Sequence, residues 1–281
     1  MQTQHQASGL ASLERCSNIP LNLGGFMIGI CKLCDQEREL QKSHSIGRSV
    51  FSRVLRPAKN NLVLNISPRL EKIEYTSDQW DTYQLCGGCE KQFNNNYENY
   101  SLNALRGKYP TIPKIILTNG VFFSNIDQLK VKHYFLSIMW RAAESNHPAY
   151  SGIEICPEVS EYFKNLFLND QEISPKIYNV RIRAVRDNAG IIDMQGLQKI
   201  IIAPYMYKTH NNIVYEMLFE GWLVEIYFKK PNYALIKKKG FLSNKTFGLI
   251  IPYVDFLEIP SLMQSFVRGK YLMDTGKFKL R

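Results

Sequence analysis

The chain has 281 residues, and its hydrophobic share of 45% is ample for a packed core in one large domain or two small ones. A net charge of +10 suits a polyanionic partner such as DNA or RNA, although membrane surfaces also attract cations. No segment approaches the roughly 20 consecutive apolar residues of a membrane span, so we exclude a membrane-spanning protein.

Residues 1–26 are polar, show no hydrophobic period and are predicted to be a poorly ordered extension. Four of the six cysteines then form two Cys-x2-Cys pairs: Cys31, Cys34, Cys86 and Cys89. Four thiolates with this spacing are typical of a tetrahedral zinc site, which stabilises a module with little core of its own. Because only Cys16 and Cys156 fall outside the pairs, we expect a structural Zn2+ ion and a reducing, cytoplasmic location instead of a disulfide framework.

The zinc-binding module is predicted to span residues 27–109. Within it, residues 39–46 should form an extended strand. Residues 53–81 mix prolines and asparagines with a short apolar run, so they should form a hairpin or a long loop inserted between the two cysteine pairs. Residues 89–105 contain no proline and predict a helix. Its packing side carries three aromatic residues: Phe93, Tyr97 and Tyr100.

Residues 110–281 are predicted to form an α+β domain that binds substrate, senses a ligand or docks a partner protein. Two short strands, at 115–117 and 121–123, should precede a helix that starts near Ser124 or Asn125, because both are good capping residues. Apolar residues at helical spacing define one face of this helix: Val131, Phe135, Ile138 and Ala142.

The second half of this domain is predicted to be mostly an antiparallel sheet. A second helix follows Pro157. Segments rich in β-branched and aromatic residues then predict strands at 177–186, 198–207, 213–219, 221–228 and 247–254. A short helix is expected at 259–267. The expected fold class is therefore α+β, with a zinc-stapled module followed by two helices and a mostly antiparallel β-sheet domain.

The succession Cys-x2-Cys, Leu-x2-Ser-His, a longer insertion and Leu-Cys-x2-Cys-Glu, which ends at Glu90, resembles the motifs of the zinc-containing HNH, or His-Me finger, endonucleases. It is most similar to a bacterial branch with Ser-His and Cys-Glu versions of these motifs. The resemblance covers about residues 27–100 and implies a ββα, treble-clef-like zinc module. It also implies metal-dependent hydrolysis of phosphodiester bonds in DNA, with RNA less favoured, and a role in phage defence or in a mobile element.

The resemblance implies roles for individual residues as well. His44 would be the general base that activates a water molecule, for which an imidazole with a pKa of about 6.5 is suited. Ser43, Glu90 and Asn94 would hold a catalytic Mg2+ or Mn2+ ion, since oxygen ligands suit these cations. Glu90 and Asn94 are spaced i, i+4 on one helix face, and Glu98 continues that face.

Two departures from the usual motifs favour a second interpretation. Ser43 supplies a neutral hydroxyl where a carboxylate or an imidazole is common, and Gly47 replaces the usual proline. The alternative is a catalytically decayed, zinc-stabilised protein that binds nucleic acid or acts as an adaptor subunit of a larger complex.

Trp140 and Arg141 are expected to be a core residue and a salt-bridge partner. Three arginines near the proposed site are candidate phosphate contacts: Arg48, Arg53 and Arg56.

Overall fold

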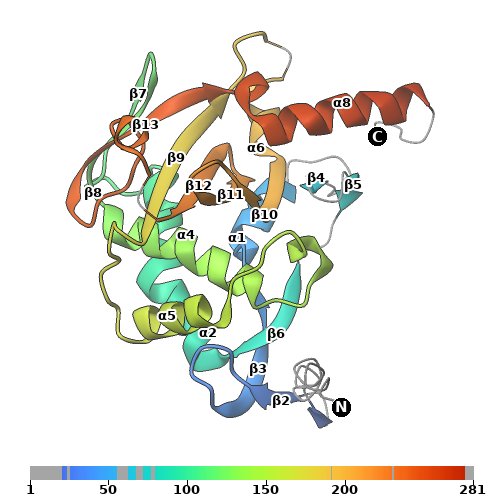
Figure 1. Ribbon diagram of the computed structural model, residues 1–281, viewed down its shortest axis with the longest axis vertical. Coiled ribbons are helices and arrows are strands. Elements are labelled where there is room, and N and C mark those ends of the chain that lie inside the picture. Colours follow the sequence, from blue (N-terminus) through green and yellow to red (C-terminus); the bar gives the residue numbers. More distant parts are fainter. Residues whose placement is uncertain are drawn as a thin grey trace, which may run out of the picture.

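The computed structural model describes residues 21–23, 26–55, 63–67, 72–76, 80–190, 192–229 and 231–275. They form the expected α+β protein, with a four-stranded sheet, a nine-stranded sheet and a layer of helices between the two (Figure 1). In this described part of the chain, no helix combines the length and the apolar character that crossing a membrane requires. The predicted extension at 1–26 lies almost wholly outside the described residues.

The small sheet is antiparallel throughout and has the order β1-β2-β3-β6. Its strands are β1 Leu21–Leu23, β2 Phe26–Ile30, β3 Glu37–His44 and β6 Asp81–Cys86. The strand predicted at 39–46 is confirmed as β3. A helix that was not predicted, α1 Arg48–Leu55, follows it directly and buries four apolar side chains: Val50, Phe51, Val54 and Leu55.

The helix predicted at 89–105 is confirmed and begins two residues earlier. It consists of α2 Gly87–Phe93, a π-helical turn Asn94–Glu98 and α3 Asn99–Leu105. Phe93 and Tyr97 are buried on its packing side, as expected, and Tyr100 is half-buried. A π-helical turn is rare and recurs at functional sites, which draws attention to this segment.

The large sheet has the order β5-β4-β10-β11-β12-β9-β13-β8-β7. Its strands are β4 Val63–Ser67, β5 Lys72–Thr76, β7 Lys114–Leu117, β8 Gly120–Asp127, β9 Tyr178–Arg186, β10 Ile200–Lys208, β11 Ile213–Phe219, β12 Trp222–Phe228 and β13 Thr246–Asp255. All its pairs are antiparallel except β4 with β10 and β9 with β13, so the prediction of a mostly antiparallel sheet is confirmed.

Of the two predictions for the insertion between the cysteine pairs, a hairpin or a long loop, the structure forms the hairpin, β4 with β5, which joins the large sheet. β4 pairs in parallel with β10, for example Leu64 with Ile200. A segment inserted into the sequence of the first module thus extends the sheet built by the second half of the chain. The division of the chain at residue 109 stays a prediction.

The remaining helices are α4 Gln128–Ala143, α5 Pro157–Leu168, α6 Met194–Gln198, α7 Tyr233–Ile236 and α8 Pro260–Asp274, with short 3-10 turns at Pro148–Tyr150 and Phe256–Glu258. The predicted start of α4 near Ser124 or Asn125 is wrong. Both residues lie in β8, whose pairing with β13 continues to Asp127, and the Asp127 carboxylate caps the helix by accepting from the Lys130 N–H.

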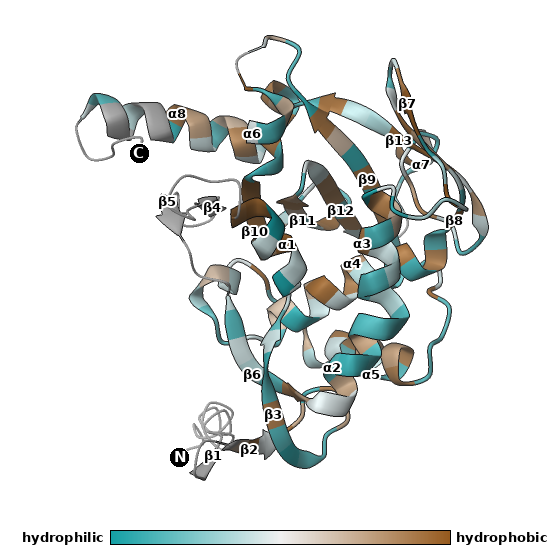
Figure 2. Cartoon of the chain, turned by 180° about the vertical axis from the view of Figure 1, so that it is seen from behind, coloured by the Kyte–Doolittle hydropathy of each residue, from teal (hydrophilic) through white to brown (hydrophobic). Residues whose placement is uncertain are grey.

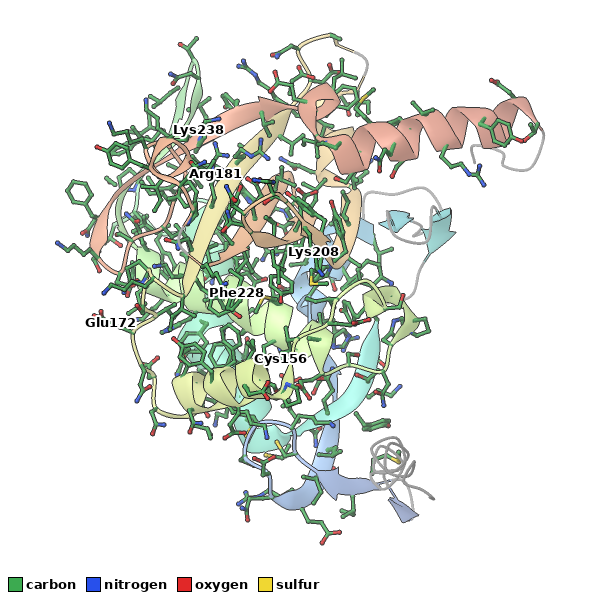
Figure 3. The ribbon with its side chains drawn as sticks, viewed as in Figure 1. Cys156, Glu172, Arg181, Lys208, Phe228 and Lys238 are labelled. Atoms are coloured by element: carbon green, nitrogen blue, oxygen red, sulfur yellow. The ribbon has the colours of Figure 1, made fainter. Side chains whose placement is uncertain are left out.

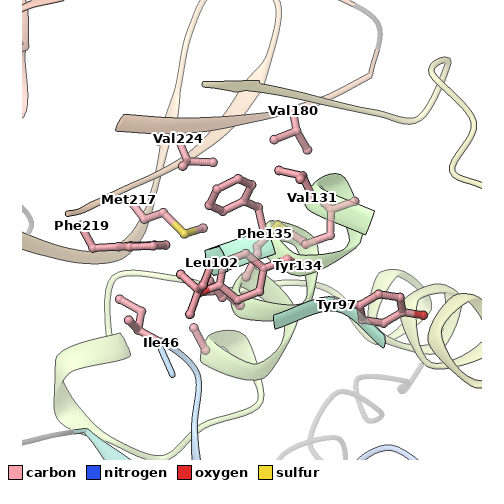
Figure 4. Close-up of a cluster of buried hydrophobic side chains, with 14 of the residues drawn as sticks. Ile46, Tyr97, Leu102, Val131, Tyr134, Phe135, Val180, Met217, Phe219 and Val224 are labelled. Atoms are coloured by element: carbon pink, nitrogen blue, oxygen red, sulfur yellow. The ribbon is translucent and has the colours of Figure 1, made fainter. Parts of the chain in front are cut away.

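The core lies between α4 and the large sheet. The predicted face of α4 is buried, but so is nearly every other residue of the helix, because the sheet covers one side and α2, α3 and α5 cover the others. Figure 4 shows this core, with Ile46 beside Leu102 and Tyr134. Apolar residues gather on β10, β11 and β12, whereas β3 and β6 are more hydrophilic (Figure 2). Ile46 therefore anchors the hydrophilic β3 segment to the hydrophobic core.

Candidate functional site

The four cysteines of the predicted zinc site are brought together. Two come from the turn between β2 and β3, and two come from the junction of β6 and α2. All four sulfur atoms lie within 4.8 Å of one another. This geometry suits a metal such as zinc, which prefers four thiolates in a tetrahedron. Cys156, labelled in Figure 3, is exposed just before α5 and takes no part in the cluster.

The cluster favours a thiolate before any ion is considered. The main-chain N–H of Cys86 donates to the sulfur of Cys31 at 3.3 Å. The pKa of Cys31 is lowered, chiefly by the hydrogen bond from the Cys89 thiol, whereas the pKa of Cys89 is raised by the same contact. Because a metal ligand must be deprotonated, this environment favours the ionised form of Cys31 that an ion would bind.

The cysteine cluster holds one end of the β3–β6 pair, and His44 lies at the other end. Leu40 pairs with Cys86 beside the cysteines, and His44 pairs with Asp81 four residues further along β3. At about 3.3 Å per residue this separation is roughly 13 Å along the strand. Metal binding at the cysteines would therefore fix the strand that carries His44 without touching its imidazole.

The chain segments next to Asp81 and His44 are also fixed by packing. Trp80, directly before Asp81, is buried and packs edge-on against Phe51 of α1, with the ring centroids 5.1 Å apart. Ile46, two residues after His44, is fully buried in the core. His44 and Asp81 are thus held between anchored neighbours.

His44 lies on the more exposed face of the pair. Its Nε2 atom is 3.9 Å from the Asp81 carboxylate, and Lys42 Nζ is 4.0 Å from the other oxygen of that carboxylate. The imidazole is 15% exposed, and Lys42 reaches into solvent. A histidine, a carboxylate and a cation therefore share one strand end, where the Nε2 atom of His44 is buried and the side chain of Lys42 is exposed. Such a set can orient an imidazole and attract a phosphate.

Ser43, the predicted metal ligand before His44, is turned to the buried face. Its hydroxyl donates to the main-chain carbonyl of Gln41 and accepts from the N–H of Leu85, both at 3.3 Å. These contacts lie at a shift in the β3–β6 register next to Gln41. The hydroxyl thus serves the main-chain hydrogen bonding of the irregular strand pair.

The predicted ligands on the helix, Glu90 and Asn94, lie on one face as expected, since the Asn94 N–H donates to the Glu90 carbonyl. The Asn94 side chain is exposed. The Glu90 carboxylate is half-buried and faces the guanidinium of Arg141, with Oε2 3.7 Å from Nη1. Eight residues further along the same helical segment, Glu98 is 3.9 Å from Nη2 of the same arginine. Burial raises the pKa of Glu98, and the charge of Arg141 opposes that rise.

These contacts decide whether the predicted residues fit a catalytic Mg2+ or Mn2+ ion. The hydroxyl of Ser43 is engaged with the main chain, and the carboxylate of Glu90 is paired with a cation. Among the described residues, the four cysteines are the one group of three or more His, Cys, Asp or Glu side chains close enough to share an ion. In this conformation the residues do not fit a catalytic divalent ion.

The three predicted phosphate contacts are placed differently. Arg48 is exposed at the start of α1. Arg53 is half-exposed, and its Nε atom lies 3.7 Å from the carboxylate of Glu220, in a pocket of about 310 Å³ that Lys199 also lines. Arg56 lies outside the described residues.

Sequence reasoning missed two features of the site. It gave no role to Asp81, because the register between β3 and β6 cannot be deduced across an insertion of this length. The expectation that Trp140 is a core residue and Arg141 a salt-bridge partner is confirmed, because both are buried and Arg141 faces carboxylates. The identity of those carboxylates is the second feature that was missed. No local sequence pattern around Arg141 indicated that these carboxylates would be those of Glu90 and Glu98.

No protein-family model, no curated protein and no solved structure matches this chain. Its function must therefore be inferred from the chemistry of its own side chains.

Proposed function

We propose that the chain is a zinc-stapled endonuclease of the HNH type that hydrolyses phosphodiester bonds of DNA, with RNA the less favoured substrate. The observation that carries this proposal is the position of His44 beside Asp81, at the end of a strand pair whose other end is held by four cysteines. The helix that follows the second cysteine pair completes a strand–strand–helix unit like the one that the sequence motifs imply. The net charge of +10 supports a polyanionic substrate.

In this proposal His44 is the general base. The imidazole accepts a proton from a water molecule, whose oxygen attacks phosphorus. The bond between phosphorus and the 3′ oxygen breaks, and the leaving oxygen takes a proton from solvent. The products are a 5′-phosphate and a 3′-hydroxyl. Asp81 would orient the imidazole, while Lys42 and Arg48 would bind the phosphate.

In this proposal a zinc ion binds the four cysteines, and the protein is located in the cytoplasm, where thiols stay reduced. Only the resemblance to HNH nucleases implies a catalytic Mg2+ or Mn2+ ion. The contacts of Ser43 and Glu90 argue against such an ion in this conformation. The role in phage defence or in a mobile element is likewise implied by the resemblance alone.

The second candidate is a zinc-stabilised protein that binds nucleic acid, or docks a partner as an adaptor, without cleaving. The pairing of Glu90 with a buried arginine favours it, because a carboxylate engaged in this way is not available to a catalytic ion.

One experiment separates the two candidates. Zinc-loaded protein is incubated with supercoiled plasmid and, separately, with single-stranded RNA, and each incubation contains Mg2+, Mn2+ or neither ion. The nuclease predicts nicked DNA with 5′-phosphate and 3′-hydroxyl ends. Binding in a gel-shift assay without cleavage under any of the three conditions would favour the second candidate and exclude the first.

A further inference from the structure

A buried arginine joins the two halves of the proposed site. Arg141 of α4 is 2% exposed, and its Nη2 atom donates to the main-chain carbonyl of Ser45 at 3.0 Å. Ser45 directly follows His44. The same guanidinium reaches Glu90 and Glu98 on the helical segment, at 3.7 and 3.9 Å, and lies over the ring of Phe93 at 5.2 Å. One cation thus connects the end of β3 to the helix after the second cysteine pair.

The surroundings of Arg141 leave the guanidinium little freedom to move. Its Nε atom donates to the carbonyl of Ser137, one turn earlier in α4. The carboxylate of Glu98 lies between Arg141 and the backbone of Gly47, where an added Cβ atom would meet it. Taking a charge out of water is costly unless it is paired, so two carboxylates beside one buried guanidinium form a mutually dependent set.

These carboxylates belong to the helix face that the HNH resemblance assigns to a divalent ion. An Mg2+ or Mn2+ ion binds oxygen at about 2.0–2.2 Å, so an ion shared by Glu90 and Glu98 would have to lie beside the guanidinium. Like charges at such separations repel strongly in a site with little water. The arginine and the ion would therefore compete for the same oxygens.

We propose that Arg141 is an internal counter-ion that takes the place of a divalent cation at Glu90 and Glu98. It neutralises part of the carboxylate charge, ties the residue after His44 to the helix, and lowers the affinity of this site for Mg2+ and Mn2+. The inference rests on the proposed function only for the identity of the competing cation. Its test uses no nucleic acid, so it can fail or succeed whether or not the chain cleaves DNA.

The test measures Mn2+ binding to zinc-loaded protein by electron paramagnetic resonance of the free ion. Arg141→Met keeps the bulk of the side chain and removes its charge. We expect this variant to bind Mn2+ at least about tenfold more tightly than the wild type, because a like charge has left the site. The gain should vanish in Arg141→Met/Glu90→Gln. A gain that persists without Glu90, or no gain at all, would overturn the proposal.

Two further arms keep the test decisive if Arg141→Met fails to fold. In Arg141→Met/Glu98→Gln, a neutral amide replaces the carboxylate that would be left buried without a partner, and a smaller gain should still appear, because Glu90 and the new amide oxygen remain to bind the ion. The wild type and Glu90→Gln should bind Mn2+ equally weakly. Tight binding by the wild type that Glu90→Gln abolishes would show that Arg141 does not exclude the ion.

Discussion

The carboxyl group of Glu98 lies against the backbone of Gly47, three residues after His44. A Cβ atom at position 47 would overlap this carboxyl group, although the glycine backbone is not in the left-handed region that side chains avoid. A side chain at this position would therefore require the Glu98 carboxyl group to move. This contact gives a physical reason for a glycine at position 47, since a Cβ atom there would push the Glu98 carboxyl group from its place beside Arg141.

The contact predicts that Gly47→Ala lowers the free energy of unfolding of the zinc-loaded protein by about 1–3 kcal/mol, as overpacking of a tight site does. In a Glu98→Ala background the same substitution should cost less, because the obstructing group is gone. Urea unfolding of the four proteins gives the comparison. Gly87→Ala is the matched control, since the nearest atom to its added Cβ is 3.9 Å away. Equal costs of Gly47→Ala in both backgrounds would contradict the account.

The cysteine cluster predicts a stability that depends on an ion. Cys34→Ser removes one of four ligands, and the bound zinc should fall from about one ion per chain to a small fraction of that, measured by atomic absorption. Structural zinc contributes on the order of 10 kcal/mol, comparable to the whole stability of a domain, so the β3–α2 region should lose its fixed structure. Cys156→Ser is the control and should keep its zinc. Full zinc retention by Cys34→Ser would refute a four-cysteine site.

Lys132 predicts a pH dependence. Burial lowers its pKa from the ordinary 10.5 to about 8 in the folded chain, where its amino group donates to Asn244. Below pH 8 both states carry the proton and folding bears the full burial cost. Above pH 10.5 neither the folded nor the unfolded state carries this proton. In between the unfolded chain binds more protons, so stability rises with pH.

The free energy of unfolding of the wild type, minus that of Lys132→Met, should therefore increase by about 3 kcal/mol between pH 8 and pH 10.5. Groups common to both proteins cancel in this difference. Chemical denaturation at several pH values measures it. A difference that stays constant or falls across this window would show that the amine is not held in a low-polarity site.

The two arginines of α1, Arg48 and Arg53, should contribute unequally to nucleic-acid binding. Arg48 is exposed, whereas Arg53 lies beside the carboxylate of Glu220. Arg48→Ala should reduce the affinity for DNA and lower the slope of log affinity against log salt by about 0.9, the loss of one phosphate contact. Arg53→Ala should change the affinity for DNA and the salt slope less than Arg48→Ala does. Titrations at several salt concentrations would reveal the opposite order if Arg53 is the phosphate ligand.

Elements with a strong local pattern could be predicted from the sequence, whereas contacts between distant segments could not. The helix at 89–105 and the strands from β7 to β13 were recognisable from their periods and compositions. The start of α4 was misplaced, because pairing of β8 with β13 extends the strand past Ser124. The short helix α1 lay next to an irregular insertion and was missed.

The same distinction applies to the candidate site. The spacing of the cysteines predicted a cluster that the fold does form. The approach of Arg141 to Glu90 depends on how α4 packs, some 50 residues further along the chain, and no local pattern encodes it. Ser43 and His44 are neighbours in sequence, yet alternation along the strand turns them to opposite faces.

Single-turnover cleavage of plasmid DNA by the wild type, His44→Ala and His210→Ala tests the central claim most directly. His210 is exposed and has no place in the proposed site, so it is the matched control. The three proteins are first shown to have the same zinc content and melting temperature. Loss of a general base predicts a rate for His44→Ala at least about 100-fold below the wild type, with His210→Ala unchanged. Cleavage by His44→Ala at the wild-type rate would contradict the assignment of His44 as the base.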